Sequence, residues 1–214
     1  MKTIKITLTA GLILILMTSC LGDKKAVNIS EMDDTNFVNQ DFKGNLIDYT
    51  KGMSACSNIS AGDIANLYSV SADKVHIEDP TTSDRYRKDM EPVCSFYIED
   101  GENDFMWLRG SIALNREIDK DEMMGEIAEA TGGGENWEEA WALKKSMSKS
   151  SEWIDDIGMA ALWNERLAEL KIKFDGYTLN VYPIKNKLNK AEVAKNRDYK
   201  KAAIEMAKAA GFIK

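Results

Sequence analysis

A single histidine limits the catalytic mechanisms available to this chain of 214 residues. Serine and cysteine nucleophiles need a neighbouring base, most often histidine, and the chain contains no Gly-x-Ser-x-Gly motif. One interpretation is a metal site made of His76, Glu78 and Asp79, because an extended segment turns His76 and Glu78 to the same side. Two ligands do not make a site, however. We therefore interpret His76 as a surface or loop residue and expect no metal and no cofactor.

Acidic residues occur in close pairs, and paired carboxylates are what glycoside hydrolysis requires. Such an enzyme fixes two carboxyl groups about 5–10 Å apart across a sugar-binding cleft. Spacing in the sequence does not establish such a pair, and solvated faces are the default in an acidic chain. We expect no enzyme, with a cell-envelope hydrolase acting on a glycan as the alternative. The candidate pairs are Glu102/Asp104, Asp119/Asp121/Glu122 and Asp155/Asp156.

A run of glycines at residues 132–134 precedes a predicted helix, and backbone amides in such a position can bind phosphate. The lysine and the serine or threonine of a phosphate-binding loop are missing. Glu135, Glu138 and Glu139 surround the start of the helix, where they complement its dipole and would repel phosphate. We interpret the glycines as a linker between helices.

Two of the five tryptophans, Trp137 and Trp141, lie one helical turn apart and therefore share a face. Two interpretations stay open. The rings seat the helix on a sheet, or they line a groove for a sugar, peptide or lipid, because flat amphipathic rings give contact area at low entropic cost. In the second case they form a binding surface.

The N-terminus has the three-part pattern of a secretory signal peptide. Lys2 and Lys5 give a positive start, residues 8–17 are apolar, and small residues follow. A bilayer-spanning helix needs about 20 apolar residues, more than this run supplies. We expect residues 1–19 to be a cleaved signal; the alternative is an N-terminal core helix.

The segment Met17-Thr18-Ser19-Cys20 resembles the lipobox of bacterial lipoproteins, with Met17 where leucine is usual. In that family the signal is cut before the cysteine, which is then acylated. The resemblance implies that palmitate-type chains on Cys20 anchor the protein, since each buried CH₂ contributes about 0.8 kcal/mol. Leu21, in place of Asp, implies the outer membrane under the sorting rule of enteric lipoproteins. The alternative is a free or disulfide-bonded Cys20.

Lipidation of Cys20 leaves two further cysteines, Cys56 and Cys94. Thiols oxidise outside the cytoplasm, so we expect a Cys56–Cys94 disulfide that stabilises the fold by roughly 3–4 kcal/mol. The alternative is a pair of buried free thiols. No Cys-x-x-Cys spacing is present, so a zinc site is not expected.

Charge and composition indicate one acidic domain behind a polar spacer. The net charge is −7 at pH 7, and removing residues 1–19 makes it more negative, which argues against nucleic-acid binding. Residues 20–50 are polar and show no sustained hydrophobic periodicity, which predicts a tether. Its later part, 37–49, can pack on the domain. Residues 51–214 are long enough for one domain with its own core.

Hydrophobic periodicity and turn residues predict an α+β fold, a mostly antiparallel sheet with helices packed against it. Ser60 is a helix N-cap candidate, Asp175-Gly176 is a hairpin signal, and Gly211 suits a helix C-terminus. Residues 71–92 are expected to be largely loop. The predicted strands are 93–98, 105–114, 158–163, 168–174 and 177–182, and helices are predicted after Ser60 and at 119–130, 136–148 and 189–210.

The two later cysteines lie in short motifs, Cys56-Ser57-Asn58-Ile59-Ser60 and Cys94-Ser95-Phe96-Tyr97, and a third motif, Ile157-Gly158-Met159-Ala160-Ala161-Leu162-Trp163, precedes the closing hairpin. Together these motifs resemble a broad family of small secreted bacterial lipoproteins of uncharacterised function. The resemblance implies a two-cysteine α+β domain in the cell envelope and assigns no catalytic residue. We expect a binding module whose partner is an envelope protein or a small ligand. An immunity-type protein that neutralises a partner is a further alternative.

Overall fold

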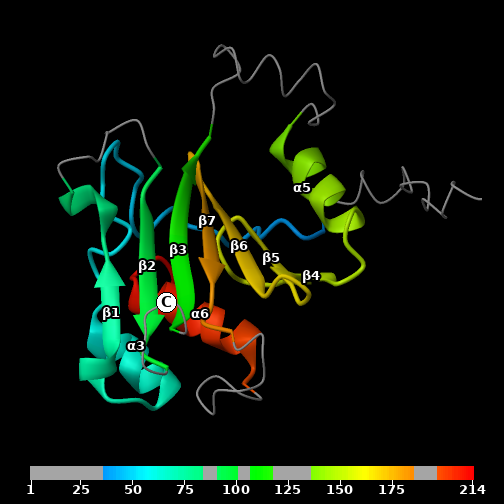
Figure 1. Cartoon of the computed structure of the whole chain (residues 1–214). Helices are drawn as coiled ribbons and strands as arrows, with labels where there is room; N and C mark the ends of the chain where they lie inside the picture. The colour runs from blue at the N-terminus through cyan, green and yellow to red at the C-terminus, as the bar shows by residue number, and fades with distance from the viewer. Residues whose placement is uncertain (1–35, 84–90, 101–106, 118–135, 186–196) are drawn as a thin grey trace, which may run out of the picture.

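The computed structural model describes residues 36–83, 91–100, 107–117, 136–185 and 197–214. Within these ranges the chain forms a seven-stranded antiparallel sheet with helices packed against it (Figure 1), which confirms the predicted α+β class. In the same part of the chain, each helix is too short or too polar to cross a membrane.

The sheet consists of two antiparallel meanders that meet at β3 and β7. The first contains β1 Val75–Glu78, β2 Val93–Ile98 and β3 Leu108–Arg116, and the second contains β4 Ser151–Ile154, β5 Ala160–Asn164, β6 Glu169–Phe174 and β7 Tyr177–Tyr182. Pairing of β3 with β7 gives the strand order β1-β2-β3-β7-β6-β5-β4. The central strand, β7, is therefore the last strand in the sequence of those described.

The structure differs from the sequence prediction at both edges of the sheet. β1 lies within residues 71–92, where a loop is expected, and β4 follows the predicted helix 136–148 in a segment without a predicted strand. Each edge strand has four residues and mixes polar with apolar positions, so its own pattern is weak. Pairing with β2 or β5 stabilises it instead. Two short 3₁₀ helices flank β1, η1 Ala72–Lys74 and η2 Pro80–Thr82.

The helix α3 Ala61–Tyr68 begins where the sequence predicts. The Ser60 hydroxyl accepts the Asp63 N–H at 3.2 Å, and the Asp63 carboxylate accepts the Ser60 N–H at 2.8 Å. These reciprocal bonds form a capping box, which satisfies donors that the helix itself cannot. The helix then turns three side chains into the core, Ile64, Ala65 and Tyr68.

The helix α6 Tyr199–Ala209 begins later than the predicted helix 189–210. Asp198 caps it by accepting the Lys201 N–H at 2.9 Å, so the helix starts at this point in the described chain. Residues 186–196 lie outside the described ranges. Gly211 follows the helix with φ +80, a conformation that glycine adopts without strain and that the sequence predicts for this position.

The main core lies on one face of the sheet, against α3 and α6, which contact each other (Figure 1). Strand side chains alternate between faces, and the inward positions of the inner strands are apolar and buried. The strand residues of this core include Phe96, Ile98, Ile112, Leu114, Leu170, Ile172, Leu179 and Val181.

The predicted disulfide is present. Cys56, in the turn before α3, is bonded to Cys94 of β2, with Cα atoms 5.0 Å apart, a separation that is usual for disulfides. Cys94 is fully buried in the main core. The bond therefore fixes the start of α3 to the sheet.

Residues 36–50 lie along the domain. The Asn39 N–H donates to the Met159 carbonyl at 2.8 Å, and the Tyr177 hydroxyl donates to the Ile47 carbonyl at 2.7 Å. The later part of the predicted tether therefore packs on the domain, and the earlier part of that tether lies outside the described ranges.

Candidate binding site on the outer face of the sheet

The sheet face opposite the main core, which we call the outer face, is polar along its inner strands. Its side chains come from alternate positions of β3, β7 and β6. The strand registers place Asn180 between Ala113 and Lys171, so side chains of three strands form a cross-strand row. The members of this face are Ser111, Ala113 and Asn115 of β3, Thr178, Asn180 and Tyr182 of β7, and Glu169, Lys171 and Lys173 of β6.

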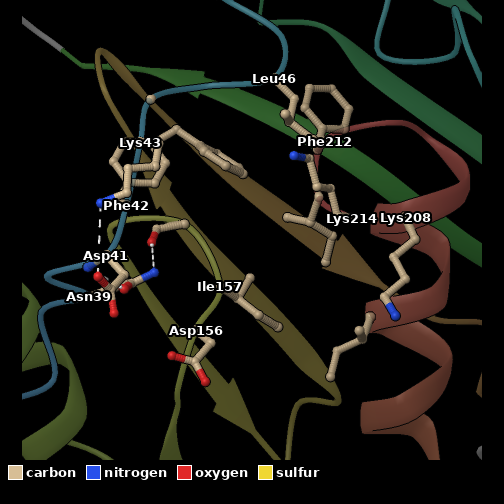
Figure 2. A pocket seen from close by; sticks show the side chains of 15 residues that line it. Asn39, Asp41, Phe42, Lys43, Leu46, Asp156, Ile157, Lys208, Phe212 and Lys214 are labelled. Carbon is tan, nitrogen blue, oxygen red and sulfur yellow. Dashed lines mark hydrogen bonds and ion pairs between the residues drawn. The ribbon is translucent and has the colours of Figure 1, made fainter.

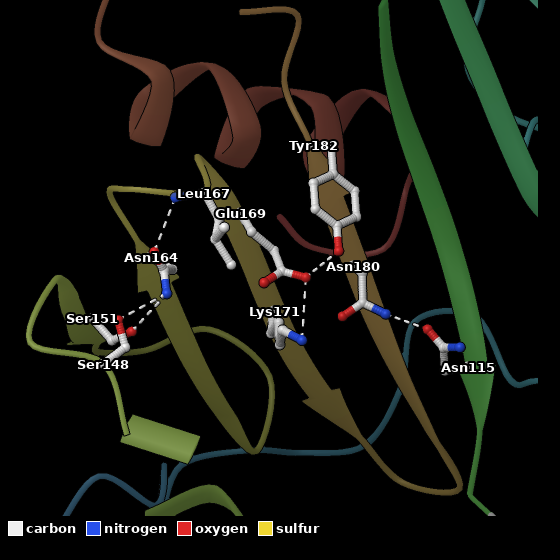
Figure 3. A network of polar contacts seen from close by, with 9 residues as sticks. All are labelled: Asn115, Ser148, Ser151, Asn164, Leu167, Glu169, Lys171, Asn180 and Tyr182. Carbon is white, nitrogen blue, oxygen red and sulfur yellow. Dashed lines mark hydrogen bonds and ion pairs between the residues drawn. The ribbon is translucent and has the colours of Figure 1, made fainter. Parts of the chain in front are cut away.

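Glu169 is the centre of a hydrogen-bonded network on this face (Figure 3). Only 3 % of the residue is exposed, yet its carboxylate accepts the Tyr182 hydroxyl and lies 3.2 Å from the Lys171 ammonium. Burial, followed by the hydrogen bond and charge of Glu169, raises the pKa of Tyr182 well above its ordinary value of 10.0. Tyr182 therefore stays protonated at neutral pH and remains a donor to Glu169.

On the β3 side of the outer face, Asn180 takes part in a second chain of hydrogen bonds. Its Nδ2 donates to Asn115 Oδ1, and Asn115 in turn donates to Glu91 (Figure 3 shows the first of these bonds). The Asn180 Oδ1 atom is buried and has no hydrogen-bond partner in the described part of the chain. An unpaired buried acceptor costs about 1–3 kcal/mol.

The helix α5 Trp137–Ser146 covers the β4–β5 end of the outer face, and Asn136 caps its first turn. Trp141 is 2 % exposed and packs on β5 side chains in a second, smaller core. Trp137 is partly buried against the same core and meets the Phe37 ring edge-on, with centroids 6.2 Å apart. Trp141 thus seats the helix on the sheet, and Trp137 keeps part of its surface exposed.

Three lysines lie on α5 and on the outer face of β6: Lys144 on the helix, and Lys171 and Lys173 on the strand. The Lys173 ammonium lies 2.7 Å from Glu117 Oε1. Lys144, on the same face of α5 as Trp141, holds its ammonium 5.3 Å from the Trp141 ring centroid, and part of its side chain stays exposed. Loss of hydration, followed by the charge of Lys171, lowers the pKa of Lys144. Ammonium groups from two elements therefore border the Glu169 network.

His76, Glu78 and Asp79, which the sequence offered as possible metal ligands, each interact with a different partner. The His76 ring stacks on Trp107 with centroids 4.6 Å apart, and its Nε2 lies 2.7 Å from Glu99 Oε1. Glu78 accepts a tyrosine hydroxyl from β2, and Asp79 caps η2. Across the described ranges, no group of three or more His, Cys, Asp or Glu side chains is placed to hold a metal ion.

Of the predicted carboxylate pairs, the structure describes Asp155 and Asp156, which are both exposed in the turn after β4. Asp156 has φ 62, which fits the tight turn. The other features fall on residues that the structure does not describe: Glu102, Asp104, Asp119, Asp121, Glu122, the glycine run 132–134, the helix 119–130, the signal 1–19 and Cys20.

An open pocket of about 390 Å³ lies between residues 39–46, the β4–β5 turn and α6. Its floor is aromatic and aliphatic, and Figure 2 shows Asp156 and Lys208 on opposite sides of it. Lys208 is 3.4 Å from Glu205 on its own helix. The acidic and basic groups at the rim of this pocket offset one another. The pocket is therefore less suited than the outer face to bind a charged ligand.

Similarity to known proteins does not assign a function to the outer face. No protein-family model, curated protein or solved structure matches the chain significantly. The face therefore has to be interpreted from its own chemistry. Its donors and acceptors are held in place by partners, and ammonium groups lie beside them, which suits a site that binds a polar ligand.

The outer-face residues carry no motif that marks them in the sequence. Glu169, Lys171 and Lys173 alternate with apolar residues, a pattern that predicts a strand with one solvated face. One signal was available: three charged residues alternate within a strand that lies between two other predicted strands. Charges at an inner position of a sheet are expected to have partners.

Proposed function

We propose that this protein is an exported bacterial envelope lipoprotein, anchored through lipid on Cys20, that acts by binding through the outer face. The proposal is carried by two buried charged residues on that face, Glu169 and Lys173, which are 3 % and 2 % exposed. Burying charged groups costs free energy unless each has a partner, and neither residue belongs to the main core. Fixing such groups in advance of a ligand lowers the entropic cost of binding.

The proposed location is supported by the N-terminus and by the disulfide. The signal pattern and the lipobox predict export and membrane anchoring, and Leu21 predicts the outer membrane. The Cys56–Cys94 disulfide supports an oxidising compartment. The polar residues after Cys20 would give the domain reach toward a partner away from the bilayer.

Binding is favoured over glycan hydrolysis by how the outer-face carboxylates are used. Glu169 is held by Tyr182 and Lys171, and Glu117 lies 2.7 Å from Lys173. Glycoside hydrolysis needs one carboxyl group that is free to protonate the leaving group. Both of these carboxylates are instead engaged by lysines. A protein that neutralises a partner is one form of the proposed binding function.

Affinity capture from the native envelope tests the proposal. The acylated full chain, solubilised in detergent, should retain a partner or ligand that mass spectrometry identifies. Thr178→Arg places a large cation on the outer face, opposite Lys173 on the central strand β7, and should reduce capture by about tenfold or more. Asn66→Arg adds the same side chain to the exposed surface of α3 and should leave capture unchanged.

Thermal unfolding shows whether both arginine variants are folded. Equal capture by the folded Thr178→Arg protein would contradict the proposal, because the outer face would then play no part. Failure of the wild-type protein to retain any partner or ligand would contradict it as well.

A further inference from the structure

The pocket beside α6 lies on the core side of the sheet, opposite the outer face. Phe174 and Phe212 of the main core line it, and Phe42, Ile157 and Ile204 pack against this core while they stay partly exposed. Its volume of about 390 Å³ falls within the range of small-molecule sites, which are concave and mostly apolar with a few polar groups. The pocket therefore has the shape and the lining of a ligand site.

Apolar groups of this pocket remain in contact with water. Leu46, at the rim, is 50 % exposed. The Phe42 ring, which is partly exposed, has its centroid 6.4 Å from that of the Phe174 ring. A ligand with an apolar body would cover these groups, which is favourable in proportion to the apolar area removed from water.

Charged groups lie on opposite sides of the pocket. Figure 2 shows Asp156 on one side, and Lys208 and Lys214 on the other. In the described part of the chain, the Asp156 carboxylate takes part in no hydrogen bond or ion pair. Lys208 lies 3.4 Å from Glu205, but a lysine ammonium has three donors. The pocket is thus matched to a cation at one end of a ligand and an anion at the other.

The other charged pair of the lining is already neutralised. The Lys43 ammonium lies 3.9 Å from Asp41 Oδ1, as the dashed line in Figure 2 marks. A ligand with a net charge would therefore meet no matching excess of charge at the rim. A ligand whose two end charges cancel fits better.

Backbone groups along the same edge are open to a ligand. Residues 42–45 have no regular structure, and within the described chain the N–H groups of Lys43 and Gly44 donate no hydrogen bond. A Cβ added to Gly44 would meet nothing within 4 Å, so the space beside this backbone is empty. Such N–H groups can donate to the carbonyl groups of a peptide.

We propose that this pocket binds a short apolar peptide with free termini. The peptide ammonium meets Asp156, the carboxylate meets Lys208 and Lys214, and apolar side chains cover Leu46 and Phe42. A peptide of about three residues spans roughly 10 Å, close to the roughly 9 Å across a compact space of this volume. The inference goes beyond the proposed function, because the pocket and the outer face lie on opposite sides of the sheet.

Calorimetric titration with the tripeptide Leu-Ala-Phe tests the inference. The acylated full chain is reconstituted in phospholipid nanodiscs, so that free detergent does not compete for the apolar surface. We expect a dissociation constant below about 1 mM. Ser-Gly-Ser, which has the same termini without the apolar side chains, should bind at least about tenfold more weakly.

Two modified peptides separate the end charges. N-acetyl-Leu-Ala-Phe lacks the ammonium, and Leu-Ala-Phe-amide lacks the carboxylate. Each should bind about threefold more weakly than Leu-Ala-Phe, since ion pairs at exposed positions are weak. Hexanoate has an apolar chain and a carboxylate but no ammonium, and it should bind more weakly than the tripeptide.

Variants of the pocket assign each end of the peptide to its partner. Asp156→Asn should weaken Leu-Ala-Phe about threefold and leave the affinity for the N-acetyl peptide unchanged. Lys208→Gln combined with Lys214→Gln should weaken Leu-Ala-Phe and leave the affinity for the peptide amide unchanged.

The control variants change exposed charges outside the pocket. They are Asp155→Asn, and Lys149→Gln combined with Lys201→Gln. These controls should bind Leu-Ala-Phe like the wild type, and Thr178→Arg on the outer face should do so as well.

Four outcomes would overturn the inference, provided that thermal unfolding shows the variants to be folded. They are the absence of Leu-Ala-Phe binding below about 1 mM, equal affinity for Ser-Gly-Ser, tighter binding of hexanoate, which would indicate an acyl-chain pocket, and unchanged Leu-Ala-Phe affinity in both pocket variants. Each of these outcomes leaves the outer-face proposal standing, because envelope capture and its dependence on Thr178 are measured separately.

Discussion

Lys173 is buried, and Glu117, its partner in the ion pair, is not. The Lys173 ammonium lies 2.7 Å from Glu117 Oε1, but 3 % of the lysine side chain is exposed against 45 % of the glutamate side chain. If the pair is broken, water reaches the carboxylate and does not reach the ammonium. Replacing Glu117 and replacing Lys173 should therefore change the free energy of unfolding by different amounts.

Glu117→Gln should reduce the free energy of unfolding by about 1–3 kcal/mol, because it leaves a buried ammonium without its carboxylate. Lys173→Met should change that free energy by less than about 1 kcal/mol, since methionine keeps the packing of the lysine stem and Glu117 stays hydrated. Urea denaturation at neutral pH measures both values. Equal losses in the two variants would contradict the asymmetry.

Removal of the disulfide should reduce the free energy of unfolding by roughly 3–4 kcal/mol, because Cys56 and Cys94 are separated by 38 residues in the sequence and their bond restricts the unfolded chain. Urea denaturation of the double variant Cys56→Ala/Cys94→Ala against the wild type measures this loss. Reductant should lower the stability of the wild type and leave the double variant unchanged. A loss below about 1 kcal/mol would show that the bond constrains little.

The second meander could be predicted because its strands carry their own signals. β6 and β7 each alternate polar with apolar residues on either side of Asp175-Gly176, and Phe174 pairs with Tyr177, as a two-residue hairpin loop requires. The edge strands β1 and β4 lack such a signal, because each has four residues and depends on a neighbouring strand for its stability. Pairing between β3 and β7 is a long-range contact that no local pattern encodes.

The outer-face site could not be predicted because its burial and its partners arise from tertiary packing. The lysines of β6 look like a solvated strand face, and the residues that surround them, Lys144 and Glu117, come from elements distant in sequence. The spacing of Trp137 and Trp141 did predict a shared helix face. Only the fold shows that Trp141 lies in a second core, leaving Trp137 with the more exposed position.

Gly158→Ala should reduce the free energy of unfolding by more than about 2 kcal/mol. Gly158 has φ +60, and an added Cβ would lie 2.5 Å from Ile172 Cγ2 and 2.6 Å from the Lys173 carbonyl oxygen. Gly62→Ala is the control: the site lies in α3, and the nearest atom to the new Cβ is Ser60 Oγ at 3.6 Å. Alanine there should stabilise the protein by about 0.5–1 kcal/mol. Thermal unfolding that ranks the two variants in the reverse order would contradict this prediction.

Lys144→Gln should stabilise the protein at neutral pH. The pKa of Lys144 is lowered from 10.5 by loss of hydration and then by Lys171, so its charge opposes folding at every pH below the folded-state pKa. Between the lowered pKa and 10.5 the unfolded chain binds more protons, and the contribution of Lys144 to stability rises with pH. The stability difference between the variant and the wild type should therefore shrink toward alkaline pH. Urea denaturation across that range measures it, and a constant difference would contradict the assignment.

Cys20→Ala should move the protein out of the membrane fraction, because the acyl chains that the lipobox predicts are attached to this residue. Two or more chains hold a protein stably on a bilayer, and without them the anchor is lost. An uncleaved signal is a poor substitute, since the apolar run of residues 8–17 is about half the length that spans a bilayer. Envelope fractionation and labelling with palmitate measure the outcome, and Cys56→Ala, which leaves Cys20 in place, should keep both label and membrane association. Membrane retention of the Cys20→Ala protein, or palmitate label on it, would contradict the lipid anchor.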